Sequence, residues 1–224
     1  MKNLILSFSL VFTLLLQSQE PVIKTVGEFS TLKVYDLINV ELIQSKENKV
    51  EISGTNTNDV VVINKNGILK IRMKLEKIFN GNKTEVKLYL TTVDIIDANE
   101  GSYISSQDTF KQYELDLRTQ EGGYIKLDVN TKINEVRADS GGIVELTGKS
   151  RDQNIVISTG GVYKGNTVES ELTKVAIRAG GTAEVQAEKL LDIKIRAGGD
   201  VFIYNKPEEV KETTTLGGRI KYIE

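Results

Sequence analysis

The chain has 224 residues, carries 29 lysines and arginines against 31 aspartates and glutamates, and contains neither histidine nor cysteine. This length allows one full-sized domain or two small ones, and the near balance of charge argues against a nucleic acid as the main partner. The lack of His and Cys excludes Ser-His-Asp and Cys-His triads, thiolate nucleophiles, disulfides and the usual zinc sites. Chemistry is left to carboxylates, Lys, Tyr or an oxygen-bound cation, and no cofactor is expected.

Residues 1–19 are predicted to be a secretory signal peptide. Lys2 supplies an early positive charge, and the apolar run from Leu4 to Leu16 is followed by polar residues. The run is too short to cross a bilayer comfortably, and no later stretch approaches about 18 apolar residues. A retained anchor is the alternative, because Ser18 is the only small residue near the expected cut. We expect an exported protein, in the periplasm or at the cell surface, with no membrane span after signal removal.

Residues 20–96 are predicted to form an N-terminal β section. Short runs of alternating apolar and polar residues are separated by turn signals, and Asn66-Gly67 between two such runs is typical of a tight hairpin. We expect antiparallel hairpins mixed with the first coils of a repeat. Such a section would cover the end of a stack whose strand edges would otherwise stay unpaired.

Residues 97–224 carry a glycine repeat. From Gly101 through six later Gly-Gly pairs, the steps between first glycines are 21, 19, 19, 20, 18 and 19 residues. Apolar and polar residues alternate on both sides, so each repeat should hold two short strands meeting at a glycine corner. Stacked about 4.8 Å apart, such coils form a β-solenoid. The corners need positive φ or close approach of stacked backbones. The corner glycines are Gly101, Gly122, Gly123, Gly141, Gly142, Gly160, Gly161, Gly180, Gly181, Gly198, Gly199, Gly217 and Gly218.

Two further columns follow from this register. An apolar residue about eight positions before the glycine, as in Ile133, Leu172 and Leu190, predicts a third inward-facing side. Four positions after the glycine, charges alternate in sign along Lys126, Glu145, Lys164 and Glu184, so opposite charges should face each other on successive coils. The last strand, from Arg219, has no capping helix, so either its charges protect it or another subunit covers it.

These features resemble the head GIN domain family of auto-transporter adhesins. The resemblance rests on Phe29-Ser-Thr-Leu-Lys-Val, on Asn66-Gly67-Ile-Leu-Lys-Ile, and on coils such as Ala138 to Gly148 and Ile195 to Val201. It covers nearly all of the mature chain, read as one domain over residues 20–224. The resemblance implies a right-handed parallel β-helix-like solenoid, all-β with coils of about 19 residues, and an adhesin-like role outside the cytoplasm. The family's Ser-Gly-Ser-Gly-like corner is replaced here by Gly-Gly, and the family has no catalytic residues to transfer.

Two tyrosines are the first candidates for a ligand site. Tyr103 and Tyr124 stand two residues after their corner glycines, in one outward column on adjacent coils. Such a pair could form a platform for a sugar ring, because tyrosine offers an apolar ring and a polar hydroxyl. Packing under the N-terminal section is the alternative.

Charged residues beside the glycines form two further candidates. Arg178 and Arg196 stack on adjacent coils as a small basic spot for a carboxylate or an anionic sugar, with ordinary surface charge as the alternative. Glu100 and Glu121 also share a column, either as a solvated edge or bridged by a cation such as Ca²⁺. We predict the solvated edge and no metal site.

Three functions are compatible with this sequence. The first is a non-enzymatic, extracytoplasmic, adhesin-like protein that binds a surface polysaccharide or protein. The second is a carbohydrate-active β-helix enzyme, which is disfavoured because acidic residues are scattered and aromatic residues make up 6% of the chain with no Trp. The third is a structural envelope protein that forms homo-oligomers through its uncapped end.

Overall fold

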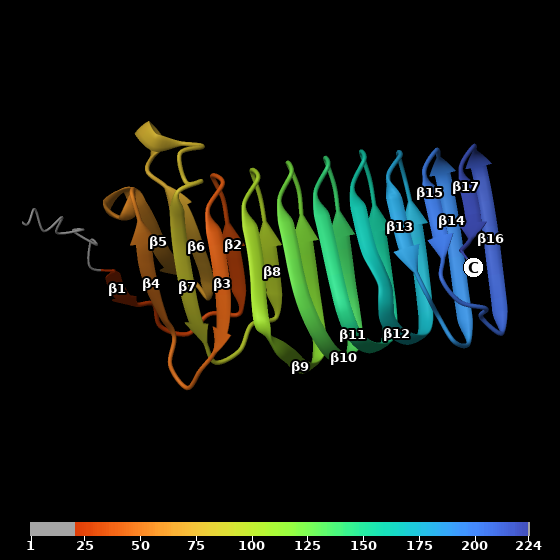
Figure 1. Cartoon of the computed structure of the whole chain (residues 1–224), viewed down its shortest axis with the longest axis horizontal. Helices are drawn as coiled ribbons and strands as arrows, with labels where there is room; N and C mark the ends of the chain where they lie inside the picture. Colours follow the sequence, from red (N-terminus) through yellow and green to blue (C-terminus); the bar gives the residue numbers. More distant parts are fainter. Residues whose placement is uncertain (1–20, 224) are drawn as a thin grey trace, which may run out of the picture.

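The computed structural model describes residues 21–223, and the predicted signal peptide lies outside the described residues. The chain forms a β-solenoid of about seven turns with coils of about 19 residues, as predicted (Figure 1). In the part of the chain that is described, the only helical segments are the short 3₁₀ turns η1 (Thr57–Asp59) and η2 (Leu75–Lys77). None of the helices described here is long and apolar enough to cross a membrane.

The regular coils stack by parallel pairing in the predicted register. Ile125 lies opposite Ile104 on one side and opposite Val144 on the other, so equivalent positions after each corner glycine share a column. Every coil turns tightly at its glycine corner and more broadly at the opposite bend (Figure 1). The strands of this region are β8 (Ile95–Ala98), β9 (Tyr103–Thr119), β10 (Tyr124–Ala138), β11 (Ile143–Ile157), β12 (Val162–Ile177), β13 (Thr182–Val185), β14 (Leu190–Ala197), β15 (Asp200–Ile203), β16 (Glu209–Leu216) and β17 (Arg219–Tyr222).

The glycine corners use both of the predicted physical reasons for glycine. Between β11 and β12, Thr159 and Gly160 have φ of 51° and 78°, and the N–H of Gly161 donates to the carbonyl of Ser158 at 3.0 Å. This is a type I′ turn, which needs positive φ at both central residues. A Cβ on Gly161 would lie 2.2 Å from the carbonyl oxygen of Ala138 on the preceding coil, so that position needs glycine for close approach. At a later corner the second glycine also needs positive φ, since Gly181 has φ of 121°.

The interior differs from the prediction at the broad bend. Ile133, Leu172 and Leu190 are only half-buried, so the predicted third apolar side is wrong. The bend places two successive residues outward, which moves the inward positions by one residue. The residues that face inward there are polar on three successive coils, namely Asn134, Gln153 and Thr173, each at most 1% exposed.

Hydrogen bonds explain how these polar side chains are held inside. Gln153 Nε2 donates to Thr173 Oγ1 at 3.3 Å, and the buried Tyr163 hydroxyl donates to Gln153 Oε1. Burial raises the pKa of Tyr163, which keeps that hydroxyl protonated as a donor. The same column is apolar on either side of this network, at Leu115 and Leu191, so the polar interior is confined to the middle coils.

The N-terminal section closes one end of the solenoid, as predicted. Strands β2 and β3 pair in parallel with β8 and β9, and β6 and β7 pair in parallel on their other side. Antiparallel pairing then begins, with β5 on β6, β4 on β7 and β1 on β4. The β5–β6 hairpin turns at Asn66 and Gly67, with φ of 53° and 74°. These strands are β1 (Val22–Thr25), β2 (Thr31–Val34), β3 (Asn39–Gln44), β4 (Lys49–Gly54), β5 (Val60–Lys65), β6 (Ile68–Met73) and β7 (Thr84–Leu90).

The C-terminal end of the described solenoid has no antiparallel strands over its last coil. Strands β16 and β17 pair only with β14 and β15 among the described strands, and nearly every residue of β16 is exposed. Glu212 and Thr214 occupy the columns that Ile193 and Ile195 fill on the coil before. An inward-pointing charge on an edge strand opposes further pairing, so this pattern favours an end protected by its own polar residues.

Candidate functional site

The predicted tyrosine column extends into a longer apolar row on one outer wall. The register aligns Tyr103, Tyr124, Ile143 and Val162 across β9, β10, β11 and β12, and all four side chains are half-buried. We call these four residues the tyrosine row. It covers three coil steps, or roughly 14 Å. The next member of the same column is Thr182, so the apolar character ends there.

The two tyrosines contact each other edge to face. Their ring centroids lie 5.3 Å apart with an interplanar angle of 86°. Tyr103 also borders a hollow of about 280 Å³ shared with side chains of β3 and β7, among them Glu41 and Lys87. Tyr103 therefore lies beside the N-terminal section, and both tyrosines remain partly open to solvent.

A row of alternating charges flanks the tyrosine row. Lys126 Nζ lies 2.8 Å from Glu145 Oε1, and Lys164 Nζ lies 3.8 Å from Glu145 Oε2, so the predicted alternation does bring opposite charges together. The Tyr124 hydroxyl donates to the same carboxylate, and Lys164 Nζ lies 5.8 Å from the centroid of the Tyr124 ring.

These contacts set the protonation states beside the row. Hydrogen bonds from Lys126 and Tyr124 lower the pKa of Glu145 below its ordinary value. Burial, together with the hydrogen bond to Glu145, raises the pKa of Tyr124. At neutral pH the wall therefore presents an ionised carboxylate held by a neutral tyrosine and two lysines.

The stacked glutamates lie on the ridge formed by the corners. Glu100 and Glu121 both have φ of 52°, as the first central residues of their turns. Burial and the neighbouring Asp36 carboxylate raise the pKa of Glu100. Residues 21–223 contain no group of three or more acidic side chains placed to hold a metal ion. The solvated edge remains our prediction for these two residues.

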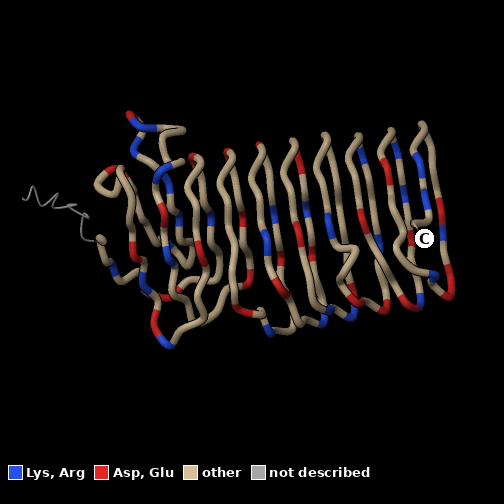
Figure 2. Tube along the Cα trace, in the orientation of Figure 1, with Lys and Arg blue, Asp and Glu red and all other residues tan. Residues whose placement is uncertain are grey.

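The arginine pair lies just before two later corners, at Gly180 and Gly198. Arg178 and Arg196 precede their glycines on adjacent coils, are exposed, and form no ion pair with another described residue. The structure therefore separates this basic spot from the tyrosine row. Both signs of charge are spread over the walls of the solenoid, without a large region of one sign (Figure 2).

Sequence reasoning found the tyrosines but missed how far the row extends. Ile143 and Val162 occupy the position two residues after their corner glycines, so the repeat alignment itself holds that signal. Their exposure could not be read from the pattern, because a branched apolar residue at an outward position can be covered by neighbouring side chains.

Together, the stacked coils and the partly open tyrosine row define a β-solenoid with one partly apolar outer wall. The chain belongs to the family described as "Putative auto-transporter adhesin, head GIN domain", whose model matches residues 28–207. The predicted family resemblance is therefore confirmed. No curated protein matches the sequence.

Solved structures of similar fold come from Bacteroides and Parabacteroides species. A "putative adhesin" from Bacteroides fragilis has a TM-score of 0.82 and 18% identity, covering 92% of this chain and 98% of that one. A "putative adhesin" from Parabacteroides merdae has a TM-score of 0.72 and 16% identity, covering 92% and 97%. A "putative lipid binding protein" from Parabacteroides distasonis has a TM-score of 0.68 and 16% identity, covering 92% and 98%. At these identities the likeness establishes the fold.

Proposed function

We propose that this protein is a non-enzymatic, adhesin-like binding protein outside the cytoplasm, and that it holds a surface polysaccharide on the tyrosine row. The observation that carries the proposal is the alignment of Tyr103, Tyr124, Ile143 and Val162 on one partly open wall. The adhesin family and its structural neighbours support the same role and an exported location.

The chemistry of the row suits a sugar chain. Tyrosine rings and branched aliphatic side chains offer apolar contact to the C–H faces of a sugar, while the phenol and amine groups nearby can bond hydroxyls. Lys126 and Lys164 lie at the edge of the row and supply such donors. Because the row crosses several coils, a linear chain lying along it would make repeated weak contacts that add in affinity.

The carboxylate nearest the row argues against the enzymatic alternative. A glycosidase needs a second carboxyl group that is protonated and placed roughly 5 to 10 Å from the first. Glu145 is held ionised by Lys126 and Tyr124, and its pKa is lowered rather than raised. This environment stabilises a binding surface and opposes proton donation to a leaving group.

A polysaccharide-binding assay tests the proposal. The purified mature protein is incubated with immobilised bacterial and host glycans, and retention and released sugar are both measured. We expect retention without turnover, lost in the Tyr103→Ala/Tyr124→Ala variant and retained in the matched Arg178→Ala/Arg196→Ala variant. Equal retention of both variants would remove the tyrosine row as the site, and release of reducing or unsaturated sugar would support an enzyme. Fractionation of the native cells tests the exported location.

A further inference from the structure

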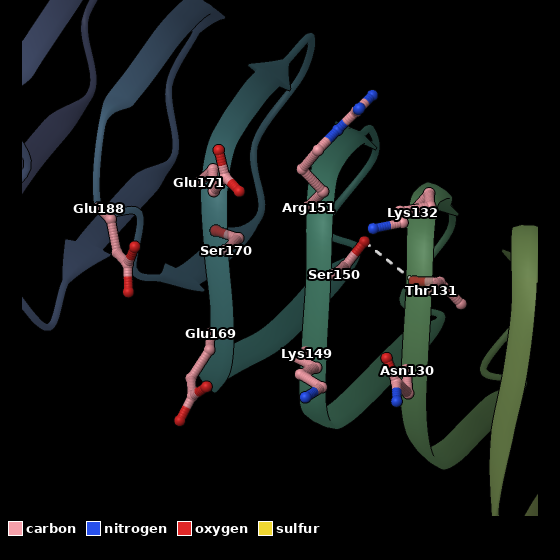
Figure 3. Close-up of a pocket in the computed structure, with 10 residues that line it drawn as sticks. All are labelled: Asn130, Thr131, Lys132, Lys149, Ser150, Arg151, Glu169, Ser170, Glu171 and Glu188. Atoms are coloured by element: carbon pink, nitrogen blue, oxygen red, sulfur yellow. Dashed lines mark hydrogen bonds between the residues drawn. The ribbon is translucent and has the colours of Figure 1, made fainter.

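A second hollow lies at the broad bends, at the opposite end of each coil from the glycine corners. It has a volume of about 350 Å³ and is formed by the bends of β10, β11 and β12 and by the segment between β13 and β14 (Figure 3). We call it the base hollow. Its lining residues are Asn130, Thr131, Lys132, Lys149, Ser150, Arg151, Glu169, Ser170, Glu171 and Glu188, and none of them is aromatic.

Three hydroxyl groups form the floor of the base hollow. Thr131, Ser150 and Ser170 are aligned by the register on three successive coils and are 6%, 2% and 4% exposed. Thr131 Oγ1 lies 2.8 Å from Asn134 Oδ1, Ser150 Oγ donates to the carbonyl of Asp152 at 3.0 Å, and Ser170 Oγ donates to the carbonyl of Gln186 at 2.8 Å. Ser150 Oγ also accepts from Thr131 Oγ1 at 3.0 Å (Figure 3). A hydroxyl has one proton and two lone pairs, so these groups, with their protons engaged, still offer a lone pair to a ligand and select for hydrogen-bond donors.

The charged side chains of the base hollow are separated by sign. The lysines Lys132 and Lys149 come from β10 and β11, whereas Glu169 comes from β12 and Glu188 from the segment between β13 and β14. Within residues 21–223, none of these four forms an ion pair. The other two charges of opposite sign are already engaged, Arg151 with Asp152 and Glu171 with Lys189.

The spacing of the free charges sets the length of a ligand that could join them. Lys149 and Glu188 lie on coils two steps apart, because Lys149 pairs with Glu169 and the N–H of Glu188 donates to the carbonyl of Ser170. Two coil steps correspond to roughly 10 Å. An extended peptide of three residues also spans about 10 Å, with an ammonium group at one end and a carboxylate at the other.

We infer that the base hollow binds a short zwitterionic peptide of about three residues. Its ammonium group lies against Glu169 and Glu188, its carboxylate lies against Lys132 and Lys149, and its N–H groups donate to the hydroxyl floor. A peptide fits this lining better than a sugar chain, because the walls offer separated opposite charges and no aromatic ring. This site is independent of the tyrosine row, which lies near the glycine corners.

Titration with L-trialanine tests the inference. Ligand-observed NMR and calorimetry on the mature protein should show saturable binding, abolished when the peptide is N-acetylated and C-amidated. Lys149→Gln and Glu188→Gln should each weaken binding about tenfold. Lys65→Gln and Glu76→Gln, exposed charges of the N-terminal section away from the hollow, are the matched controls and should leave binding unchanged. Binding of the blocked peptide as tightly as the free one would overturn the inference.

A charge exchange separates a specific site from general attraction. Lys149→Glu alone and Glu188→Lys alone should each abolish binding, whereas the two together should restore it, because the peptide can bind in the reverse direction. Failure of the pair to restore binding, with melting temperatures unchanged, would contradict the proposed orientation of charges. The Tyr103→Ala/Tyr124→Ala variant should still bind trialanine. If the base hollow bound a charged polysaccharide but not trialanine, the peptide proposal would be overturned. The proposal for the tyrosine row would still stand.

Discussion

The two ends of the solenoid protect their exposed strand edges in different ways. At the N-terminal end, β1, β4 and β5 pair in antiparallel fashion, and Val50 and Ile52 of β4 are fully buried beneath a mostly exposed β1. At the C-terminal end, the described parallel stack ends on β16 and β17, and two inward columns of β16 have become polar, at Glu212 and Thr214. A stack of repeats is stabilised by contacts between neighbours, so its last coil gains about half of what an inner coil gains. We therefore expect a rigid N-terminal end and a C-terminal coil that opens first, which hydrogen exchange would resolve.

The largest expected contrast is between two isoleucines near opposite ends of the solenoid. Ile52 on β4 is fully buried, whereas Ile220 on β17 is partly open. Ile52→Ala should lower the free energy of unfolding by about 3 kcal/mol, because it leaves a cavity that its neighbours cannot fill. Ile220→Ala should cost about 1 kcal/mol or less. Denaturant unfolding followed by circular dichroism checks both, and equal losses would show that the two ends are equally packed.

The corner glycines should show the next contrast. Gly161→Ala places a Cβ against the carbonyl of Ala138, so stacked backbones must move apart at a cost of about 2 kcal/mol or more. A Cβ on Gly217, in the last corner, meets nothing within 4 Å, and only its φ of 76° opposes substitution. Gly217→Ala should therefore cost about 1 kcal/mol. A greater loss at Gly217 than at Gly161 in thermal unfolding would contradict close approach as the main reason for the paired glycine.

The polar columns of the last coil should keep the protein from associating. Replacing both Glu212 and Thr214 by isoleucine restores the residues of the preceding coil and turns the open end into an apolar edge. We expect this double variant to form concentration-dependent oligomers in sedimentation analysis, while the parent chain does not. The Lys211→Ile/Thr213→Ile variant changes outward positions of the same strand and is the matched control. Oligomers of the parent chain that Ile220→Lys disrupts would instead support the self-assembly alternative.

The smallest effects should be those of pH, with opposite signs in the two regions. The pKa of Glu100 is raised in the folded state, so the folded protein gains stability as pH falls through that raised pKa. Glu100→Gln should stabilise the protein at neutral pH and have no such effect in acid.

Arg219 lowers the pKa of Asp200, so this carboxylate stabilises the fold above its unfolded pKa, and the contribution is lost as pH falls through the folded value. Asp200→Asn should be slightly destabilising at neutral pH only. Thermal melts of both variants between pH 3 and about 8 check these signs, and a destabilising Glu100→Gln or a stabilising Asp200→Asn at neutral pH would contradict them.

Local pattern and long-range packing contributed differently to what could be predicted. The recurring glycines were enough to predict the coil length, the register and the facing charges of Lys126, Glu145 and Lys164, because these depend on equal spacing along the chain. The prediction that Ile133 faces inward at the broad bend was wrong. The bend turns two successive residues outward, and the positions of the apolar residues in the sequence do not reveal such a break in the alternation. The base hollow was missed for the same reason, although Thr131, Ser150 and Ser170 recur at the repeat spacing.

By itself, the sequence determined that this protein is a column of short strands turned at glycines, since glycine readily adopts the positive φ of the turn and permits the close contact between stacked backbones at nearly every corner. Only the tertiary structure decided the order of the first coils, in which β6 and β7 stack outside β2 and β3 although they follow them in the chain. It also decided which outward side chains stay open to a partner. Both depend on contacts between residues far apart in sequence, whose free energy no local pattern records.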